Sequence, residues 1–502
     1  MGDCFIRASK SEAIGLRIQD DRWFCILRCP GEDWRHALSI RARDAVPGSA
    51  IIPFLASKSL SLLFLGVPGL KRALVSGIVL IVASAAFVSC GYNGSSSQHK
   101  LSGVKFRALV SNPLLPTGTG TVSALNIVNA SKDVLSASAI SLSGAPHAGL
   151  MAISPNLKLI AVFSGQGQNN SIATIDTTTE SAATDSSGKG TVPTFSIPGA
   201  TESMFIANDN ITAYAAVPSA PIVGQPSGAV VVMDLGTGTV KATIPVTGAH
   251  FVVQSPDGNH VLVFSDNSDS ITVLDTILIG TSQDPRTTVS GFDRPVWAIF
   301  SDDTSAFIFN CGPECGGTAA GIATFDIGSP GPGPKLALGG ATYGLLDGAT
   351  LYVAGTPPNT PCGSGTAATT CGTLNLVDTS SMTITNSSPI IITDGYHDRM
   401  QMGANGRLFI GSHSCTNINV SGGEVRGCLS IFNTSNSGVV VPPQVGDATG
   451  IAPIPGRKVV YVCQGGVFQI FDTTTDQLLV QTRQTDIVGQ STDVKVVDPP
   501  PS

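Results

Sequence analysis

The chain has 502 residues, of which 42% are hydrophobic and only 13% charged, with 56 Gly and 32 Pro. This composition excludes a globally disordered chain and favours many short strands joined by turns. Of the 28 basic and 35 acidic residues, residues 1–90 hold 11 and 7, so residues 91–502 carry 17 basic and 28 acidic ones. A body this acidic, without a basic stripe, excludes nucleic acid as a partner.

Residues 1–66 differ from the rest of the chain. They contain two of the three Trp residues and also Cys4, Cys25 and Cys29. A secretory signal begins close to the start of a protein, yet the signal-like segment of this chain follows these 66 residues. We therefore predict that translation starts near Val67 and that residues 1–66 are a mis-called upstream segment without a domain.

A lipoprotein signal follows at residues 67–89. The basic pair Lys71-Arg72 precedes an uncharged stretch, 73–89, and then Cys90, which is the order of a secretory signal. Residues 87–90, Phe-Val-Ser-Cys, resemble the lipobox of bacterial lipoproteins, with Phe in place of the usual Leu, Val or Ile.

The lipobox resemblance implies that Cys90 carries a lipid and begins the mature chain, with residues 90–104 as a flexible tether to the membrane. It also implies a location in the cell envelope, either on the outer side of the cytoplasmic membrane or in the outer membrane. The alternative is a membrane-anchor helix that ends in an incidental cysteine. The apolar run is short for that role, because a span usually needs about 20 apolar residues.

One unit recurs eight times along residues 105–498. It is a short apolar strand that ends in Asp or Asn, followed by a polar turn and another apolar run. The steps between successive copies are 39–58 residues, which is the spacing of four-stranded propeller blades. Asp and Asn suit these turns because their side chains accept a hydrogen bond from the backbone two residues on. The eight residues are Asn129, Asp176, Asp234, Asp275, Asp326, Asp378, Asn433 and Asp472.

The best-preserved unit spans residues 248–275. It contains the turn Ser-Pro-Asp-Gly at 255–258, the apolar strand 261–264 and a second strand that ends in Val273-Leu274-Asp275. This pattern resembles the YVTN family of β-propeller repeats. The resemblance implies an all-β propeller but no particular function, because the family includes lactonases, binding proteins and surface proteins.

The two ends of the repeat region predict how the ring closes. The first strands, near 106–111, 122–128 and 134–142, supply three strands of a blade, and the apolar segment 493–497 is left over at the other end. We expect this segment to be the inner strand of that first blade, since closure removes exposed sheet edges. The prediction is a single eight-bladed propeller over 105–498 with a tail at 499–502; the alternative is seven blades with one insertion.

Six cysteines form three close pairs, each within the connection between the second and third strands of successive blades. Their spacing favours local disulfides, which an exported protein can form. A metal site at Cys311-Gly-Pro-Glu-Cys315 is the alternative, but no second Cys or His pair accompanies it, so we predict no metal. Cys463 is expected to be a buried free thiol. The predicted disulfides are Cys311–Cys315, Cys362–Cys371 and Cys415–Cys428.

The candidate ligand-binding residues lie where the chain enters an inner strand. These positions come together at the axial mouth of a propeller, on the face that also carries the long loops between second and third strands. Imidazole and guanidinium groups there can bind an anionic ligand. The alternative is that they cap strands and satisfy backbone groups. The candidates are His147, His250, Arg294, His397, Asp398 and Arg399.

The sequence favours a binding or interaction scaffold without a cofactor. We expect a monomer, held at the membrane through the lipid on Cys90, whose ligand is an unidentified protein, glycan or small molecule. The alternative is a lactonase-like hydrolase with its site at the channel mouth. The sequence contains neither the Cys-x-x-Cys-His motif of covalent haem nor a Gly-x-Ser-x-Gly elbow.

We expect intact-mass measurement of the membrane fraction to show an acylated Cys90 at the N-terminus. Cys90→Ala should release an unacylated, precursor-like protein, because the lipid is the only membrane tether in this interpretation. Detection of an unmodified N-terminus upstream of residue 90 would contradict the lipoprotein assignment.

Overall fold

The computed structural model describes six strands between residues 4 and 65, and residues 101–500 except 118–119, 143–144, 146, 167–168, 186–189, 363–369, 417, 420–424 and 480–484. Residues 1–98 and 99–502 form two separate compact units. The predicted signal peptide and Cys90 lie outside the described residues. No helix in the described part of the chain is long and apolar enough to cross a membrane.

The strands of the N-terminal unit form one four-stranded antiparallel sheet and one hairpin. The prediction that residues 1–66 precede the true translation start is not tested by them. The sheet consists of β1 (Cys4–Ala8), β2 (Glu12–Gln19), β3 (Arg22–Leu27) and β4 (Ala37–Arg41), and the hairpin of β5 (Ser49–Phe54) and β6 (Leu60–Leu65).

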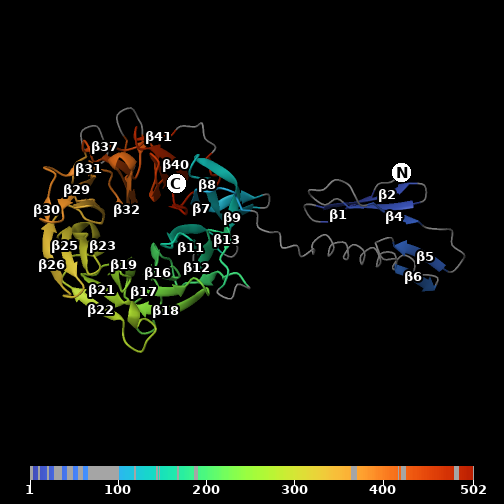
Figure 1. The fold of residues 1–502 in the computed structure, drawn as a ribbon, viewed down its shortest axis with the longest axis horizontal. Coiled ribbons are helices and arrows are strands. Elements are labelled where there is room, and N and C mark those ends of the chain that lie inside the picture. The colour runs from blue at the N-terminus through green and yellow to red at the C-terminus, as the bar shows by residue number, and fades with distance from the viewer. Residues whose placement is uncertain are drawn as a thin grey trace. The chain divides into compact units, whose positions relative to one another are not determined.

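The second unit is an eight-bladed β-propeller, as the sequence predicts, and its blades follow one another around a ring (Figure 1). Each blade is an antiparallel sheet whose strands A to D run from the axis outward. Blade 1 combines the two ends of the repeat region, since β42 (Asp493–Val496) pairs with β7 (Arg107–Thr117), which continues to β8 (Gly120–Asn129) and β9 (Val134–Ser141). Ring closure by the C-terminal strand is thereby confirmed.

Blades 2 to 5 follow in chain order. Blade 2 has an extra short strand, β14 (Phe195–Ser196), paired with its third strand. Their strands are β10 (Ala148–Ile153), β11 (Leu159–Gln166), β12 (Asn169–Asp176) and β13 (Ser181–Ala182); β15 (Ser203–Ile206), β16 (Thr212–Val217), β17 (Ala229–Asp234) and β18 (Thr239–Pro245); β19 (Ala249–Gln254), β20 (His260–Ser265), β21 (Ser270–Asp275) and β22 (Arg286–Ser290); and β23 (Pro295–Phe300), β24 (Ser305–Asn310), β25 (Gly321–Asp326) and β26 (Pro332–Ala337).

Blades 6 to 8 complete the ring. Blade 6 has an extra strand, β31 (Ile390–Ile392), and the loop of blade 7 contains the hairpin β34 (Ile418–Asn419) and β35 (Val425–Arg426). The blade strands are β27 (Tyr343–Asp347), β28 (Thr350–Gly355), β29 (Gly372–Asp378) and β30 (Thr383–Ile384); β32 (Tyr396–Gly403), β33 (Arg407–His413), β36 (Leu429–Asn433) and β37 (Gly438–Val440); and β38 (Ala448–Pro453), β39 (Val459–Gln464), β40 (Val467–Asp472) and β41 (Gln477–Leu478). In the residues that the structure describes, three short 3₁₀ helices occur between strands: η1 (Thr276–Leu278), η2 (Gly312–Cys315) and η3 (Ala404–Gly406).

The repeated Asp and Asn residues close the turn between strands C and D in every blade. Seven of the eight side chains accept a hydrogen bond from the backbone N–H two residues on, for example Asp176 from Thr178 at 2.7 Å. In blade 5, Asp326 accepts from Ser329, three residues on, at 3.1 Å. These turns all lie on one face of the ring, together with the A–B hairpins.

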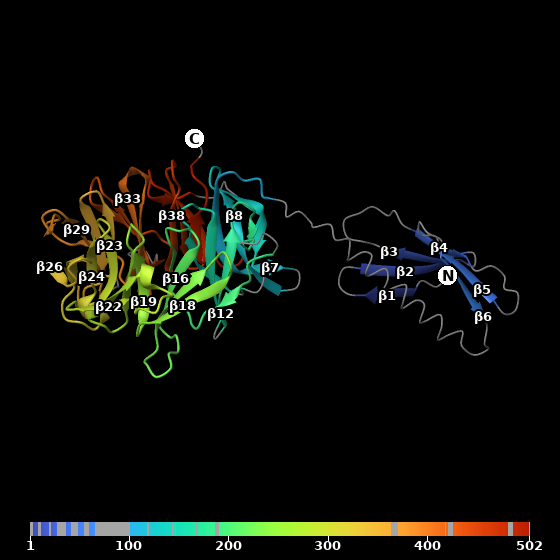
Figure 2. The same cartoon turned by 60° about the horizontal axis from the view of Figure 1, so that its bottom comes forward.

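The core of the propeller lies between its blades. Eight clusters of buried apolar side chains are present in the described residues, and each joins one pair of neighbouring blades. The seam between blades 8 and 1 is as well filled as the others, with Tyr461 and Val110 fully buried. A tilted view shows these blades arranged around the axis (Figure 2).

A buried arginine fastens the closing blade. Arg107, at the start of β7, forms ion pairs of 2.6 Å with Asp498, just after β42, and 2.9 Å with Glu180 in the C–D turn of blade 2. The side chains of Arg107 and Glu180 are only 10% and 3% exposed. This arginine therefore joins the first strand of the propeller, its last strand and the neighbouring blade.

The seam between blades 8 and 1 contains a second buried ion pair. Asp133, in the C–D turn of blade 1, has no exposed surface and pairs with Arg457 from the A–B turn of blade 8. The Tyr461 hydroxyl donates to the same carboxylate at 2.6 Å.

We expect Arg107→Met to lower the free energy of unfolding by about 3–5 kcal/mol, because it leaves two carboxylates near each other without a cation. Lys241→Met is the matched control, since its pair with Asp234 is 41% exposed on the lysine side, and such pairs contribute about 0–1 kcal/mol. Chemical denaturation monitored by tryptophan fluorescence measures both. Equal effects of the two substitutions would contradict the role assigned to Arg107.

Candidate functional site

The loops between strands B and C and the crossings from strand D to the next strand A lie on the face opposite the Asx turns. Three of these B–C loops carry disulfides: Cys311–Cys315 in blade 5, Cys362–Cys371 in blade 6 and Cys415–Cys428 in blade 7. The local pairing predicted from the sequence is confirmed, and Cys463 is a buried free thiol. In the chain-entropy account each such crosslink contributes about 2–3 kcal/mol. Stable disulfides also indicate an extracytoplasmic protein.

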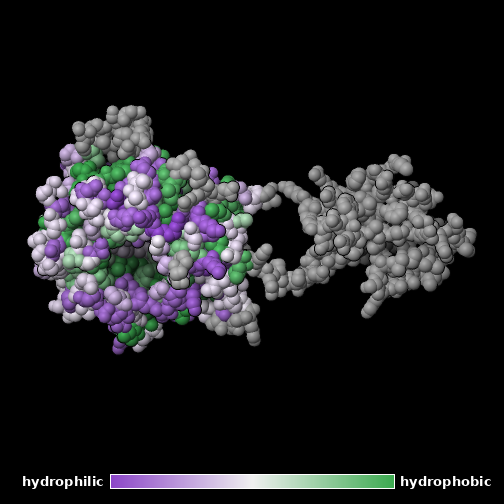
Figure 3. Space-filling view, turned by 45° about the horizontal axis from the view of Figure 1, so that its top comes forward, coloured by the Kyte–Doolittle hydropathy of each residue, from purple (hydrophilic) through white to green (hydrophobic). Residues whose placement is uncertain are grey.

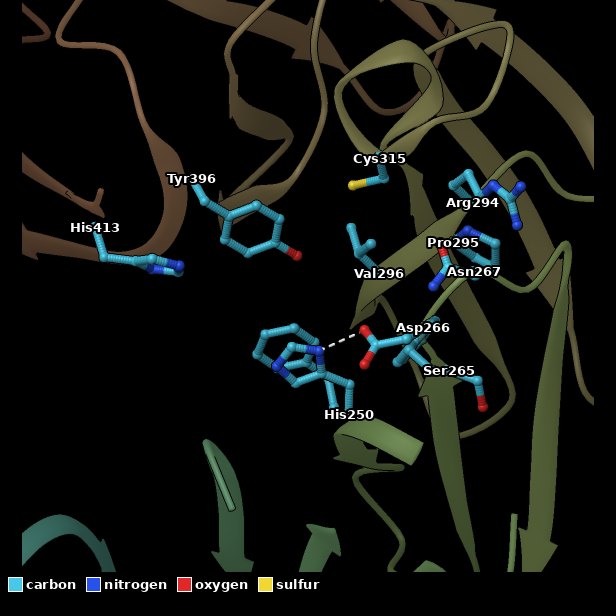
Figure 4. A pocket seen from close by; sticks show the side chains of 12 residues that line it. His250, Ser265, Asp266, Asn267, Arg294, Pro295, Val296, Cys315, Tyr396 and His413 are labelled. Carbon is cyan, nitrogen blue, oxygen red and sulfur yellow. Dashed lines mark hydrogen bonds and ion pairs between the residues drawn. The ribbon is translucent and has the colours of Figure 1, made fainter. Parts of the chain in front are cut away.

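A cavity of about 220 Å³ lies on this face at the mouth of the central channel. The space-filling view shows a hollow at the centre of the ring with a largely hydrophilic surround (Figure 3). Residues from the inner-strand starts and B–C loops of blades 4, 5 and 7 surround the cavity (Figure 4). They are His250, Phe251, Phe264, Ser265, Asp266, Asn267, Arg294, Pro295, Val296, Cys315, Tyr396 and His413.

A shared backbone irregularity places side chains at this mouth. The pairing of strands A and B shifts register near the start of β19, β23, β32 and β38, and the extra residues are His250, Val296, Asp398 and Thr449. A β-bulge of this kind changes the direction in which a side chain points. Three of the bulge residues are accordingly partly exposed and Thr449 is exposed, whereas the residue just before each of them is buried.

The first polar cluster is centred on His250. Its Nδ1 lies 2.6 Å from Asp266 and its Nε2 lies 3.1 Å from Glu202, which precedes β15 of blade 3. Burial lowers the pKa of His250, but the hydrogen bonds to the two carboxylates outweigh it and raise the pKa to about 9. Near neutral pH this cluster is therefore an imidazolium held between two carboxylates.

The second polar cluster consists of Asp398, Arg399 and His413 in blade 7. The Asp398 carboxylate lies 3.0 Å from Nη1 of Arg399 and 3.6 Å from Nδ1 of His413. The contact with Asp398 raises the pKa of His413 above its ordinary value. This cluster has two cationic side chains and one carboxylate when His413 is protonated.

Aromatic rings connect the two clusters across the channel. Tyr396 of blade 7 lies 5.2 Å from the ring of His413 and 6.3 Å from that of Phe251 in blade 4, and Phe251 stacks on His250 at 4.3 Å. The Tyr396 hydroxyl points into the cavity (Figure 4). Blades 4 and 7 are three positions apart in the ring, so these rings narrow the channel at this level.

Two polar atoms near the mouth have no hydrogen-bond partner among the described residues. Within the described part of the chain, Oδ1 of Asp398 and Nε of Arg294 are buried without a hydrogen bond, although Nε of Arg294 lies 3.8 Å from a carboxylate oxygen of Asp269. Buried polar atoms are costly to leave unsatisfied. Arg294 lines the cavity, whereas Asp398 is linked to it through His413.

The six residues predicted from the sequence fall into three groups. His250 and Arg294 line the cavity, and Asp398 and Arg399 contact it through His413. His397 is fully buried, with its Nε2 3.0 Å from the carbonyl of Thr393, and burial lowers its pKa to about 4. His147, which has a positive φ of 67°, is half-buried before β10 and is not among the cavity residues.

Sequence reasoning missed the acidic partners of His250 and the aromatic rings that connect the two clusters. Glu202 and Asp266 occupy a D–A crossing and a B–C loop, the two positions that the propeller geometry brings to the mouth, but a lone carboxylate in a loop gives no signal of its own. No group of three or more His, Cys, Asp or Glu side chains suited to a metal ion occurs in the residues that the structure describes.

Comparison with known proteins gives a fold and no closer relationship. No protein-family model matches the chain. No curated protein sequence matches it either. Among solved structures, the dihydro-heme d1 dehydrogenase NirN is similar with a TM-score of 0.54 and 10% identity over 78% of this chain and 75% of that one, which shows a shared fold alone.

Two further similar structures have lower scores. The Dos1 propeller has a TM-score of 0.48 and 12% identity over 69% of this chain and 86% of its own. The periplasmic gluconolactonase PpgL of Pseudomonas aeruginosa has a TM-score of 0.45 and 14% identity over 79% of this chain and 99% of its own.

The disulfide loop beside the cavity holds an unusual carboxyl group. Glu314 lies between Cys311 and Cys315 and accepts a hydrogen bond from the Thr356 backbone of blade 6 at 2.7 Å. Burial raises the pKa of Glu314 to about 8, although this hydrogen bond opposes the shift. The side chain is therefore largely uncharged in the folded protein at neutral pH.

We expect Glu314→Gln to stabilise the protein at pH 7.5 and to have little effect at pH 4.5. The unfolded chain releases the Glu314 proton near its ordinary pKa of 4.5, while the folded chain holds it up to about 8. Between these values the wild-type free energy of unfolding falls as pH rises, by at most about 1.4 kcal/mol per pH unit, and Gln removes that loss. Denaturation of both proteins at the two pH values measures it; a variant less stable than wild type at pH 7.5 would contradict the argument.

Proposed function

We propose that this protein is a lipid-anchored, extracytoplasmic propeller that binds a small molecule in the cavity at its channel mouth. The single observation that carries the proposal is the cavity itself, about 220 Å³ in volume and bordered by ionisable side chains from several blades. A pocket with an apolar floor and a few convergent polar groups is the usual form of a small-ligand site.

The surrounding structure supports this function. Two of the three disulfide loops, those of blades 5 and 7, are next to the cavity, since Cys315 lines it and His413 directly precedes the Cys415–Cys428 loop. Crosslinked loops lose less conformational entropy when a ligand binds, which favours affinity. The lipid on Cys90 and the tether at 90–104 would hold the propeller at the membrane, within reach of ligands outside the cytoplasm.

A lactonase-like hydrolase is the second candidate, and one observation favours it. Asp398 lies beside Nδ1 of His413, an arrangement that can orient an imidazole as a general base. In that reaction Nε2 of His413 would take a proton from water, the hydroxide would add to the lactone carbonyl, and the ring C–O bond would break with return of the proton to the alkoxide. Ligand turnover by the purified protein distinguishes this candidate from a binding protein.

We expect Val296→Phe to abolish ligand binding without unfolding the protein, because Val296 lies at a bulge and borders the cavity. The matched control is Thr449→Phe, which places the same side chain at the corresponding bulge of blade 8, outside the cavity. Thermal-shift and calorimetric titrations against amino acids, sugars, carboxylates and lactones measure the binding. If Val296→Phe binds the active compound as tightly as wild type, the cavity is not the site.

A further inference from the structure

The ionisable groups at the mouth are separated by sign. The His250 cluster, with Glu202 and Asp266, has one imidazole and two carboxylates and is therefore negative. The raised pKa of His250 keeps its net charge near −1 rather than −2 around neutral pH. Both ring nitrogens of His250 are already bonded to these carboxylates, so the imidazole itself cannot bind an anion.

The Asp398 cluster has the opposite balance. Its single carboxylate faces Arg399 and His413, which are both cationic when His413 is protonated. Nη1 of Arg399 donates to the Asp398 backbone carbonyl at 2.8 Å and Nε to that of Thr449 at 3.4 Å. No hydrogen bond in the described part of the chain engages Nη2 of Arg399 or Nε2 of His413, and both donors remain for a ligand.

Tyr396 lies between the two clusters. Its ring contacts His413 on one side and Phe251, with His250 stacked behind it, on the other. The face of Tyr396 can attract a cation, and its hydroxyl can donate or accept a hydrogen bond. Phe251 is buried and already stacked on His250. A molecule above these rings would therefore meet carboxylates at one end and cationic donors at the other.

We infer that the ligand is a small zwitterion, an amino-acid-like molecule whose ammonium group faces Glu202 and Asp266 and whose carboxylate faces Arg399 and His413. A ligand with one charge would leave one cluster uncompensated, whereas a dipolar one matches both. The inference rests on the proposed function and specifies its ligand class. A cavity of about 220 Å³ has room for a molecule of this kind.

The test uses ω-amino acids of increasing length: glycine, β-alanine, 4-aminobutanoate and 6-aminohexanoate. We expect isothermal titration calorimetry with the wild-type mature protein to show one preferred length, set by the separation of the two clusters. The N-acetyl and amide derivatives of the preferred compound, each lacking one charge, should bind at least about tenfold more weakly. These comparisons use one folded protein, so they do not depend on the stability of any variant.

Variants assign the two ends of the ligand. Asp266→Asn should weaken binding of the zwitterion but leave the weak binding of the N-acetyl derivative, which has no ammonium group, unchanged. His413→Gln should weaken binding of the zwitterion but leave the weak binding of the amide derivative, which has no carboxylate, unchanged. His260→Gln is the control, because His260 begins β20 on the opposite face of the ring. Circular dichroism and thermal unfolding verify the folding of each variant.

The outcomes separate this inference from the proposed function. If a singly charged derivative binds as tightly as its zwitterion, the ligand class is wrong. If sugars or simple carboxylates bind, Val296→Phe blocks them and no amino acid binds, the inference fails while the proposed function stands. If no compound of any class binds, both fail.

Discussion

The structure depends on the need to cover both faces of every blade. The third strands, such as β17 with five consecutive buried residues, are apolar on both sides and cannot be left next to water. A ring of blades covers both faces of every blade only when the ring is closed, because an open array would leave one apolar face exposed at each end. The eight inter-blade clusters, one for each pair of neighbours, are the result.

Closure explains why both ends of the propeller lie in one blade. The pairing of β42 with β7 makes the last strand complete the first sheet, and Arg107 binds carboxylates from the C-terminal segment and from blade 2. These contacts, like the pair of Asp133 with Arg457, lie on the face of the A–B and C–D turns. Structural ion pairs and the repeated Asx turns thus occupy one face, which leaves the other free to vary.

The fold could be predicted because its signals are local and repeated. An Asp or Asn at the end of each third strand marks a turn wherever it occurs, and eight copies fix the number of blades. The disulfide pairing could also be predicted from the sequence, since two cysteines close together within one loop have few other possible partners. The residues of the site were harder to predict than the fold, because they depend on the direction of each side chain. A shift of one residue in a strand reverses that direction. His397 and Asp398 are adjacent in sequence, yet the bulge at the start of β32 turns Asp398 toward His413 and leaves His397 between the blades.

Comparison of the blades with one another supplies the information that a single stretch of sequence lacks. His397 occupies the position of Ala249, Pro295 and Ala448, all of which are buried, while Asp398 occupies that of His250 and Val296. An ionisable residue at the bulge position is therefore a stronger signal of a site than one at the preceding position. Glu202 and Tyr396 have no such signal, because their roles arise only when separate blades meet at the mouth. Glu202 precedes blade 3 and contacts His250 of blade 4, and Tyr396 of blade 7 lies near Phe251 of blade 4. Ring closure thus creates the site as well as the core, since no blade alone contains the contacts that define it.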